Sequence, residues 1–301
     1  MDYYLVTPVY NEEDNINQLI ETVITQTVTP EKWIIVNNGS SDNTVKIIEE
    51  IIINKNINFI HIVNQQRIEN VGGNINFNMA VNYGFSCAMS NTHVGVDFIG
   101  KIDADVLLPP DFFQTLLEIL IENKQIGVIS AINYVHRGNN PQKYSEDLLF
   151  QCDEITNSRS SISDIRLYRI NAIVDIGGMP TAKYAPDSMT LLLLGDSGWG
   201  IMKTGKTHFV TTRDAFCSIP TFANMVKTGE TNYYYGYPVI SLLFKTFILI
   251  LQNKKYAPFG LIVGYFQSFI RKEARVSSEI VTIVRKQKGL ASLIINYINR
   301  Q

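Results

Sequence analysis

The first 130 residues or so alternate short apolar runs with stretches in which apolar residues recur at helical spacing. Apolar runs bounded by polar turns predict buried strands, and recurrence every three or four residues predicts amphipathic helices. This alternation is typical of βαβ units, so we expect an α/β fold with a mostly parallel sheet flanked by helices. The expected strands are residues 3–8, 32–37, 58–63, 96–103 and 126–132, and the expected helices are residues 15–25, 42–52, 73–90 and 111–123.

Polar and glycine-containing loops follow the expected strands. In open α/β sheets, ligands bind at the edge formed by the carboxyl ends of the strands. Residues 133–230 are less regular, with a strand-like stretch at 163–170 and a Gly- and Pro-rich stretch at 175–184. We interpret residues 1–230 as one catalytic domain with its candidate site at this edge.

Residues 231–301 have a different character. Two apolar runs, 239–251 and 259–270, are each shorter than the approximately 20 residues that a membrane-spanning helix needs. We expect a helical hairpin that lies in the membrane interface; the alternative is a buried helix pair with a solvated, charged tail. Basic residues that would meet anionic headgroups follow the hairpin: Arg271, Lys272, Arg275, Arg285, Lys286, Lys288 and Arg300.

Composition narrows the function classes. The net charge is −2, from 26 basic and 28 acidic residues, and no basic stripe precedes the C-terminal segment, so nucleic acid is not expected as a partner. The three cysteines lack zinc-ligand spacing, and no signal peptide is recognisable at the N-terminus, so we expect a cytoplasmic protein. The charged fraction of 18% is below the usual value of about 25%, which is consistent with a surface covered by a membrane or partner.

The sequence KIDADV (101–106) places Asp103 and Asp105 two residues apart at the end of an apolar strand. Mg²⁺ and Mn²⁺ take oxygen ligands, and a site with one or two carboxylates leaves positions for substrate phosphates. The pair therefore fits a metal–diphosphate site, although an isolated Asp-x-Asp is more often a solvated turn.

Two earlier loops, in TPVYNE (7–12) and VNNGSSDNT (36–44), also follow strands. The amides of Asn37 and Asn38, beside Gly39, have the groups needed to pair with a nucleobase, and a simple turn is the alternative. We interpret Ser41 and Asp42 as caps of the next helix rather than as ligand contacts.

These motifs in this order resemble family 2 glycosyltransferases of the GT-A fold. The resemblance covers roughly residues 3–215 and rests on TPVYNEEDNI (7–16), VNNGSSDNT (36–44), NVGGNINFNMAVNYGF (70–85), KIDADVLLPPDF (101–112) and GGMPTAKYAPDSMTLLLL (177–194). It implies Asp105 as the metal ligand and Asp103 facing the ribose or the waters of the metal. Asn38 stands where the family commonly has an aspartate, which leaves the donor base open. The implied nucleotide-sugar contacts are Thr7, Pro8, Tyr10, Asn38, Gly72, Asn74, Asp103, Ala104 and Asp105.

The resemblance also places Asp187 in the acidic acceptor motif of the family. One carboxylate there takes the proton of the attacking hydroxyl, and Asp187 is the candidate base. Pro186 replaces the common acidic neighbour. A helix N-cap is the alternative role for Asp187, and Asp196 is a second candidate base.

The resulting hypothesis is a glycosyltransferase with a metal-dependent inverting mechanism. It would use Mg²⁺ or Mn²⁺ and a UDP- or GDP-linked sugar, act on a glycan or polyprenyl-linked acceptor, and lie peripherally on the inner face of the cell membrane. One alternative is an inactive sugar-binding or membrane-scaffold protein of the same fold. The other is a nucleotidyltransferase, disfavoured because no Gly-x-Gly-Thr-Arg loop follows the first strand.

Overall fold

The computed structural model describes residues 1–69, 73–90, 95–135, 154–155, 165–212, 221–252 and 256–289. The chain divides into two compact units, Met1–Ala215 and Phe216–Gln301. The division lies nearer the N-terminus than the boundary expected from the sequence at 230/231. Helix α7 (Phe222–Tyr234) lies within the second unit, where it packs against α9 (Ala257–Ile270).

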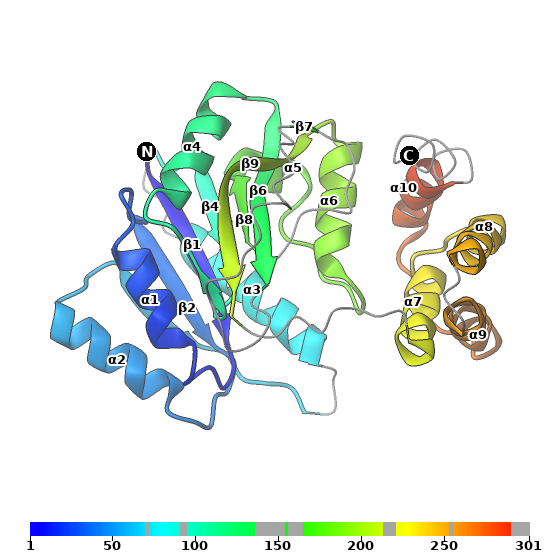
Figure 1. Ribbon diagram of the computed structural model, residues 1–301, viewed down its shortest axis with the longest axis horizontal. Helices are drawn as coiled ribbons and strands as arrows, with labels where there is room; N and C mark the ends of the chain where they lie inside the picture. The colour runs from blue at the N-terminus through cyan, green and yellow to red at the C-terminus, as the bar shows by residue number, and fades with distance from the viewer. Residues whose placement is uncertain are drawn as a thin grey trace. The chain divides into compact units, whose positions relative to one another are not determined.

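A mixed sheet forms the centre of the first unit (Figure 1). The strand order is β3-β2-β1-β4-β8-β6-β9-β5, with β7 paired to β9. Strands β3, β2, β1 and β4 are mutually parallel, as expected from the βαβ pattern, whereas β8 runs antiparallel between β4 and β6. The strands are β1 (Tyr3–Val9), β2 (Lys32–Asn37), β3 (Ile60–Asn64), β4 (Phe98–Lys101), β5 (Val106–Leu107), β6 (Ile126–Val135), β7 (Glu154–Ile155), β8 (Arg166–Arg169) and β9 (Gly200–Thr211).

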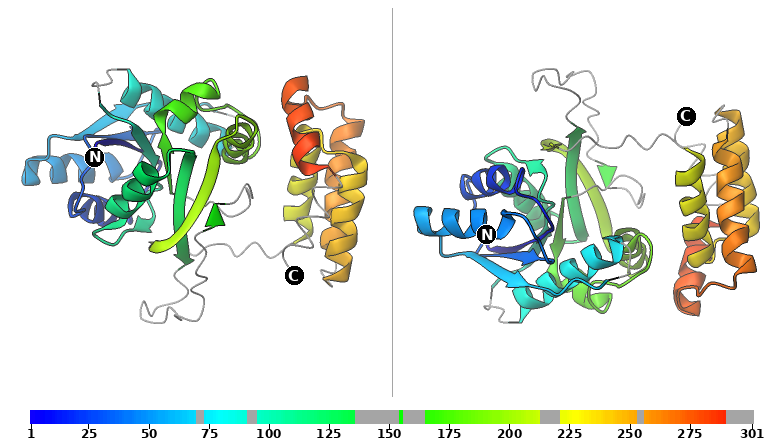
Figure 2. Two further views of the ribbon diagram at one scale, coloured as in Figure 1. Left: turned by 90° about the horizontal axis from the view of Figure 1, so that it is seen from above. Right: turned by 90° about the horizontal axis from the view of Figure 1, so that it is seen from below.

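Helices cover both faces of this sheet (Figure 2). Successive side chains of a strand point to opposite faces, and β1 is buried along its whole length. Tyr3 and Leu5 pack with α1, α2 and α4, whereas Tyr4 and Val6 pack with α3, α5 and α6. The helices are α1 (Ile16–Ile24), α2 (Thr44–Lys55), α3 (Gly73–Met89), α4 (Phe112–Glu122), α5 (Ile170–Asp175) and α6 (Pro186–Asp196).

Helix α3 lies very close to the sheet at Gly84. A Cβ atom at this position would stand 2.4 Å from a methyl carbon of Val6 and 2.8 Å from one of Val36. Only a residue without a side chain allows this approach. The sequence motif at 70–85 therefore contributes helix packing in addition to any role at the site.

The carboxyl ends of the first strands meet at one edge of the sheet. Val9 at the end of β1 is in register with Asn37 of β2, and Asn37 is in register with Asn64 of β3. Strand β4 ends at Lys101, and the amide of the next residue, Ile102, still donates to the carbonyl oxygen of Val6 at 3.0 Å. The polar loops that follow β1, β2, β3 and β4 are thereby collected at this edge.

The second unit consists, in its described part, of α7, α8 (Val239–Leu251), α9 and α10 (Ser278–Lys288). Helices α8 and α9 correspond to the two apolar runs of the expected hairpin. Leu242, Leu261 and Tyr265 form a buried seam with Tyr233 of α7. Gly264 permits the contact of α9 with α7, because a Cβ atom there would clash with the carbonyl oxygen of Val226.

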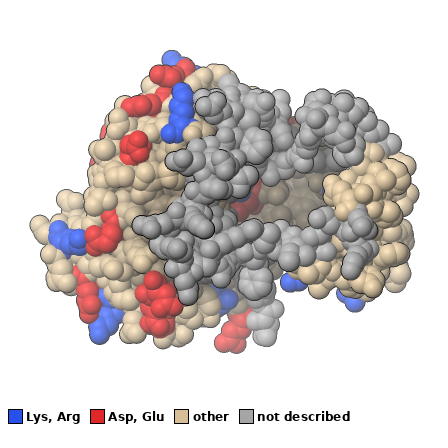
Figure 3. Space-filling view, viewed as in Figure 1, with Lys and Arg blue, Asp and Glu red and all other residues tan. Residues whose placement is uncertain are grey.

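The outer faces of α8 and α9 remain exposed and apolar. On the face drawn in Figure 3, the described part of these helices carries few charged side chains. The exposed residues recur at spacings of three, four and seven, which places them on one side of each helix. They include Ile240, Leu243, Phe247, Ile250 and Leu251 of α8, and Phe259, Phe266, Phe269 and Ile270 of α9. Within the described residues, none of the helices combines the length and hydropathy that crossing a bilayer requires.

Candidate active site

The loops after β1 and β2 are fastened to each other by hydrogen bonds. The amide of Asn11 donates to Ser40 Oγ at 3.1 Å, and the amide of Ser41 donates to Asn11 Oδ1 at 2.8 Å. The amide of Glu12 donates to Thr44 Oγ1 at 2.8 Å. These contacts fix the shape of the sheet edge before any ligand is present.

Asp42 stabilises the loop just before α2, but the N-cap of this helix is Asn43 and not Ser41 or Asp42 as expected. Its Oδ1 accepts a hydrogen bond from the amide of Thr44 at 3.0 Å, and its Oδ2 accepts one from the amide of Glu13 at 3.1 Å. Burial raises the pKa of Asp42, but the hydrogen bonds from Thr44 and Glu13 outweigh it, so the pKa lies below its ordinary value. Asp42 is therefore ionised at neutral pH and engaged in the loop structure.

A cavity of about 320 Å³ opens at the sheet edge. It contains six of the residues expected to contact a nucleotide sugar, together with Glu12, Arg67 and Phe77. The strand ends and loops of β1, β2, β3 and β4, with helix α3, all contribute to it. The six expected residues that line it are Pro8, Tyr10, Asn38, Asp103, Ala104 and Asp105.

Three of the expected nucleotide-sugar contacts are not among the residues that line the cavity. Thr7 is fully buried, does not line the cavity, and accepts a hydrogen bond from Trp33 Nε1 at 2.9 Å. Gly72 is not among the residues that the structure describes. Asn74 is in the first turn of α3, and the structure describes its backbone but not its side chain.

Asn38 is the buried polar residue of the cavity. It is 4% exposed, and its side-chain oxygen accepts no hydrogen bond from any residue that the structure describes. A buried acceptor without a donor is costly, so a ligand N–H that enters the cavity would be stabilised there. Asn37, by contrast, is used in the fold: its Nδ2 donates to Asn64 Oδ1 at 2.8 Å, and its Oδ1 accepts from the amide of Ser40.

Arg67 is a cavity residue that the sequence did not reveal. Its guanidinium carbon lies 3.8 Å from the centre of the Tyr10 ring, in a cation–π contact. Its place in the sequence could have identified it, because Arg67 soon follows the third expected strand and therefore falls at the carboxyl edge of the sheet. Arg67 gives the cavity a positive charge near the two aspartates.

The two aspartates of the Asp-x-Asp motif are two residues apart in the chain but have different surroundings. Asp103 Oδ1 is 2.7 Å from Lys101 Nζ, whose side chain is 4% exposed. Burial lowers the pKa of Lys101, but the attraction of Asp103 and Asp187 outweighs it, so the pKa lies above its ordinary value and the lysine stays protonated. Asp105 is half-buried, and its backbone carbonyl accepts from the amide of Thr212 at 2.8 Å.

The residues present fit a divalent cation of the Mg²⁺ or Mn²⁺ type. Two carboxylates, Asp103 and Asp105, line one cavity that is large enough to supply phosphate oxygens from a ligand. Among the described residues there is no group of three or more acidic, histidine or cysteine side chains that would hold a metal without a ligand. A cation here would take its remaining ligands from substrate phosphates or water.

Asp187 stands in the first turn of α6. The preceding Ala185 adopts a left-handed conformation with φ of 41°, and Pro186 begins the helix, so the chain turns sharply before Asp187. Asp187 Oδ1 is 2.8 Å from Arg166 Nη1, and the aspartate side chain is 40% exposed. Asp187 does not line the cavity itself. The alternative candidate, Asp196, lies at the opposite end of the same helix.

The arrangement of sheet and helices is the GT-A fold of glycosyltransferases, as expected. A mannosyltransferase from Pyrobaculum calidifontis, solved with GDP-Man and Mn²⁺, has a TM-score of 0.57 at 14% identity, covering 96% of this chain and 80% of that one. Residues 1–349 of TarS from S. aureus, solved with UDP-GlcNAc, have a TM-score of 0.55 at 16% identity, covering 97% and 80%. At these identities the likeness establishes the fold alone.

Sequence comparison identifies the family. Poly-beta-1,6-N-acetyl-D-glucosamine synthase of Staphylococcus aureus (strain MSSA476) is 22% identical over 245 residues, which are 70% of this chain and 56% of that protein. The chain thus spans about half the length of this curated relative. The model of glycosyl transferase family 2 matches residues 4–179, more than half of the chain. The chain belongs to glycosyl transferase family 2.

Proposed function

We propose that this protein transfers a sugar from a UDP- or GDP-linked donor to the hydroxyl of a glycan or polyprenyl-linked acceptor, with inversion at the anomeric carbon. One observation carries the proposal. A single cavity contains a buried amide oxygen at Asn38 and the carboxylates Asp103 and Asp105. These are the groups needed to bind a nucleobase N–H at one end and a metal-bound diphosphate at the other.

In the proposed reaction, Asp187 removes the proton of the acceptor hydroxyl as its oxygen bonds to the anomeric carbon. The bond from that carbon to the diphosphate oxygen breaks, and the electron pair leaves with the nucleoside diphosphate. Asp105 would hold Mg²⁺ or Mn²⁺, which supplies positive charge to the departing diphosphate. Asn38, Tyr10 and Arg67 bind the nucleotide, and Pro8, Ala104 and Asp103 complete its pocket.

Calorimetry with UDP, GDP and dTDP, each with and without Mn²⁺, tests the donor site of the wild-type protein. We expect one nucleotide to bind at least about tenfold more tightly when Mn²⁺ is present, which corresponds to about 1.4 kcal/mol. Release of UDP or GDP from UDP-GlcNAc, UDP-glucose and GDP-mannose, with water as acceptor, then tests turnover. Absence of binding by all three nucleotides would contradict the proposal and favour a scaffold of the same fold.

The second part of the proposal is that residues 216–301 hold the enzyme on the cytoplasmic face of an anionic membrane. The exposed faces of α8 and α9 provide the apolar surface, although the two helices also share a buried seam. Arg271 and Lys272, directly after α9, are exposed and match anionic headgroups in charge. A membrane at this unit would favour an acceptor that is itself linked to a lipid.

We expect the protein, prepared without detergent, to float with vesicles that contain phosphatidylglycerol. Burying one phenylalanine in an apolar phase contributes about 1.5–3 kcal/mol, so the double variant Phe247→Ser/Phe259→Ser should bind at least about a hundredfold more weakly. Ile53→Ser is the matched control, because Ile53 is 76% exposed but lies on α2 of the first unit. A wild-type protein that binds neither neutral nor anionic vesicles would refute this part of the proposal.

A further inference from the structure

Two cations are buried next to each other in the sheet. Lys101 on β4 and Arg166 on β8 are register partners in the antiparallel pair, and their side chains are 4% and 7% exposed. Like charges on facing positions of a sheet repel each other, and burial of a charge is costly unless it is paired. The arrangement therefore depends on counter-charges.

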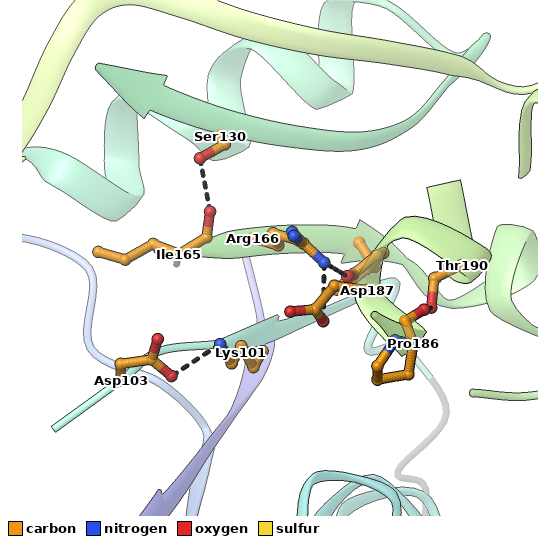
Figure 4. Close-up of polar contacts among 9 residues, drawn as sticks. Lys101, Asp103, Ser130, Ile165, Arg166, Pro186, Asp187 and Thr190 are labelled. Atoms are coloured by element: carbon orange, nitrogen blue, oxygen red, sulfur yellow. Dashed lines mark hydrogen bonds and ion pairs between the residues drawn. The ribbon is translucent and has the colours of Figure 1, made fainter. Parts of the chain in front are cut away.

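Each cation is paired with a carboxylate, and the two carboxylates come from different segments of the chain (Figure 4). Lys101 Nζ reaches Asp103 Oδ1 at 2.7 Å, and Arg166 Nη1 reaches Asp187 Oδ1 at 2.8 Å. The four groups carry two positive and two negative charges, so the cluster is neutral. Because Lys101 and Arg166 are register partners, the cluster places the loop after β4, which lines the cavity, near the first turn of α6.

The position of Arg166 is itself fixed by its neighbours. Ser130 Oγ donates to the carbonyl oxygen of Ile165 at 2.5 Å, just before Arg166 in the chain (Figure 4). Arg166 Nη1 also lies 3.5 Å from the hydroxyl oxygen of the buried Tyr168, on the same face of β8. On the helix side, Thr190 Oγ1 donates to the carbonyl oxygen of Pro186 at 3.1 Å. Both ends of the Arg166–Asp187 contact are thus anchored.

An ion pair that served stability alone would gain little, because desolvation of the two charges offsets most of their attraction. This pair is also asymmetric: Arg166 is buried, whereas the Asp187 side chain is 40% exposed. The Asp187 carboxylate is accessible to a reactant, and the buried Arg166 guanidinium restricts the position of that carboxylate.

We propose that Arg166 is a positioning residue, which holds the Asp187 carboxylate at a fixed place relative to the Asp103–Asp105 cavity, with its register partner Lys101 beside it on β4. The inference rests on the proposed function, because it assigns Arg166 its role through Asp187 as the base. Neither the family match nor the cavity itself identifies Arg166, which lies outside the cavity lining.

The test compares Arg166→Met and Arg166→Lys, each made in the wild type and in Asp187→Asn. Turnover is the release of nucleoside diphosphate from the donor that the wild type uses, and affinity is measured with the matching nucleotide and Mn²⁺. We expect Arg166→Met to lower kcat by about 10–100-fold, as loss of a supporting hydrogen-bond partner commonly does, and to leave nucleotide affinity within about twofold. Arg166→Lys should restore most of kcat, since it keeps the charge.

In the Asp187→Asn background, Arg166→Met should have no further effect on kcat, because the two residues act as one unit. Arg169→Met is the matched control: it lies on the same strand, but its guanidinium donates to the carbonyl oxygen of Leu120 at 2.6 Å, away from the cluster. Its kcat should equal that of the wild type. Should Arg166→Met fail to fold, Ser130→Ala, which removes only the bond behind Arg166, should lower kcat several-fold without changing nucleotide affinity.

The outcomes separate this inference from the proposed function. An active wild type with an unchanged kcat in Arg166→Met, or equal losses in both backgrounds, would overturn the positioning role alone. A parallel loss of nucleotide affinity would show that Arg166 acts on the donor and would also overturn it. A wild type that releases no nucleoside diphosphate from any donor would overturn the proposed function and this inference together.

Discussion

Replacing Asp105 by alanine is expected to remove the Mn²⁺-dependent part of nucleotide binding. Asp105 lines the cavity, and its backbone is held independently by the amide of Thr212, so the loop should keep its shape when the carboxylate is lost. A direct metal contact to a diphosphate is worth several kcal/mol, so affinity in Mn²⁺ should fall by about a hundredfold or more, equivalent to about 3 kcal/mol. Affinity without metal should change little.

Calorimetry with the nucleotide that the wild type prefers measures this effect. Asp111→Asn is a matched control, because Asp111 is an exposed aspartate a few residues along the chain and outside the cavity. Asp103→Ala provides the second comparison, since Asp103 is paired with Lys101. If Asp105→Ala bound the nucleotide in Mn²⁺ as tightly as the wild type, and Asp103→Ala did not, the metal contact would belong to Asp103.

The sheet edge was largely predictable because its determinants are local. Strands β2 and β4 fall within the expected ranges and β1 extends only to Val9, just past its expected end, while the parallel order follows from the helices between them. Parallel strands necessarily gather the loops after them at one edge. For this reason the sequence alone predicted that Pro8, Asn38 and Asp105 lie at the same edge of the sheet, and all three line one cavity in the structure.

What the sequence left open depends on distant pairing. Arg166 lies opposite Lys101 only because β8 inserts antiparallel beside β4, and no local periodicity encodes that pairing. The long strand β9 was not expected, because its sequence mixes lysines and glycines with apolar residues and its burial alternates imperfectly. The sequence also could not decide between the alternative roles of Asn37 and Asn38. Adjacent residues at a strand end point to opposite sides, so Asn37 bonds to Asn64 within the fold, whereas Asn38 lines the cavity.

Changing Asp187 to asparagine is expected to lower kcat by about 10³-fold while nucleotide affinity stays within about twofold of the wild type. A positioned general base contributes roughly 10²–10⁴ in rate, and the amide is nearly the same size but takes no proton. Asp187 lies outside the lining of the nucleotide cavity, so the loss should appear in turnover and not in donor binding. The split between kcat and affinity is therefore the diagnostic result.

Asp196→Asn is the decisive control, because Asp196 lies at the far end of α6 and was the second candidate base. Its kcat should match that of the wild type. Loss of the Asp187 charge also leaves the buried Arg166 without this partner, so thermal unfolding of each variant must be compared to separate destabilisation from chemistry. A folded Asp187→Asn variant with near-wild-type turnover would exclude Asp187 as the base, and a large loss in Asp196→Asn instead would transfer that role to the other end of the helix.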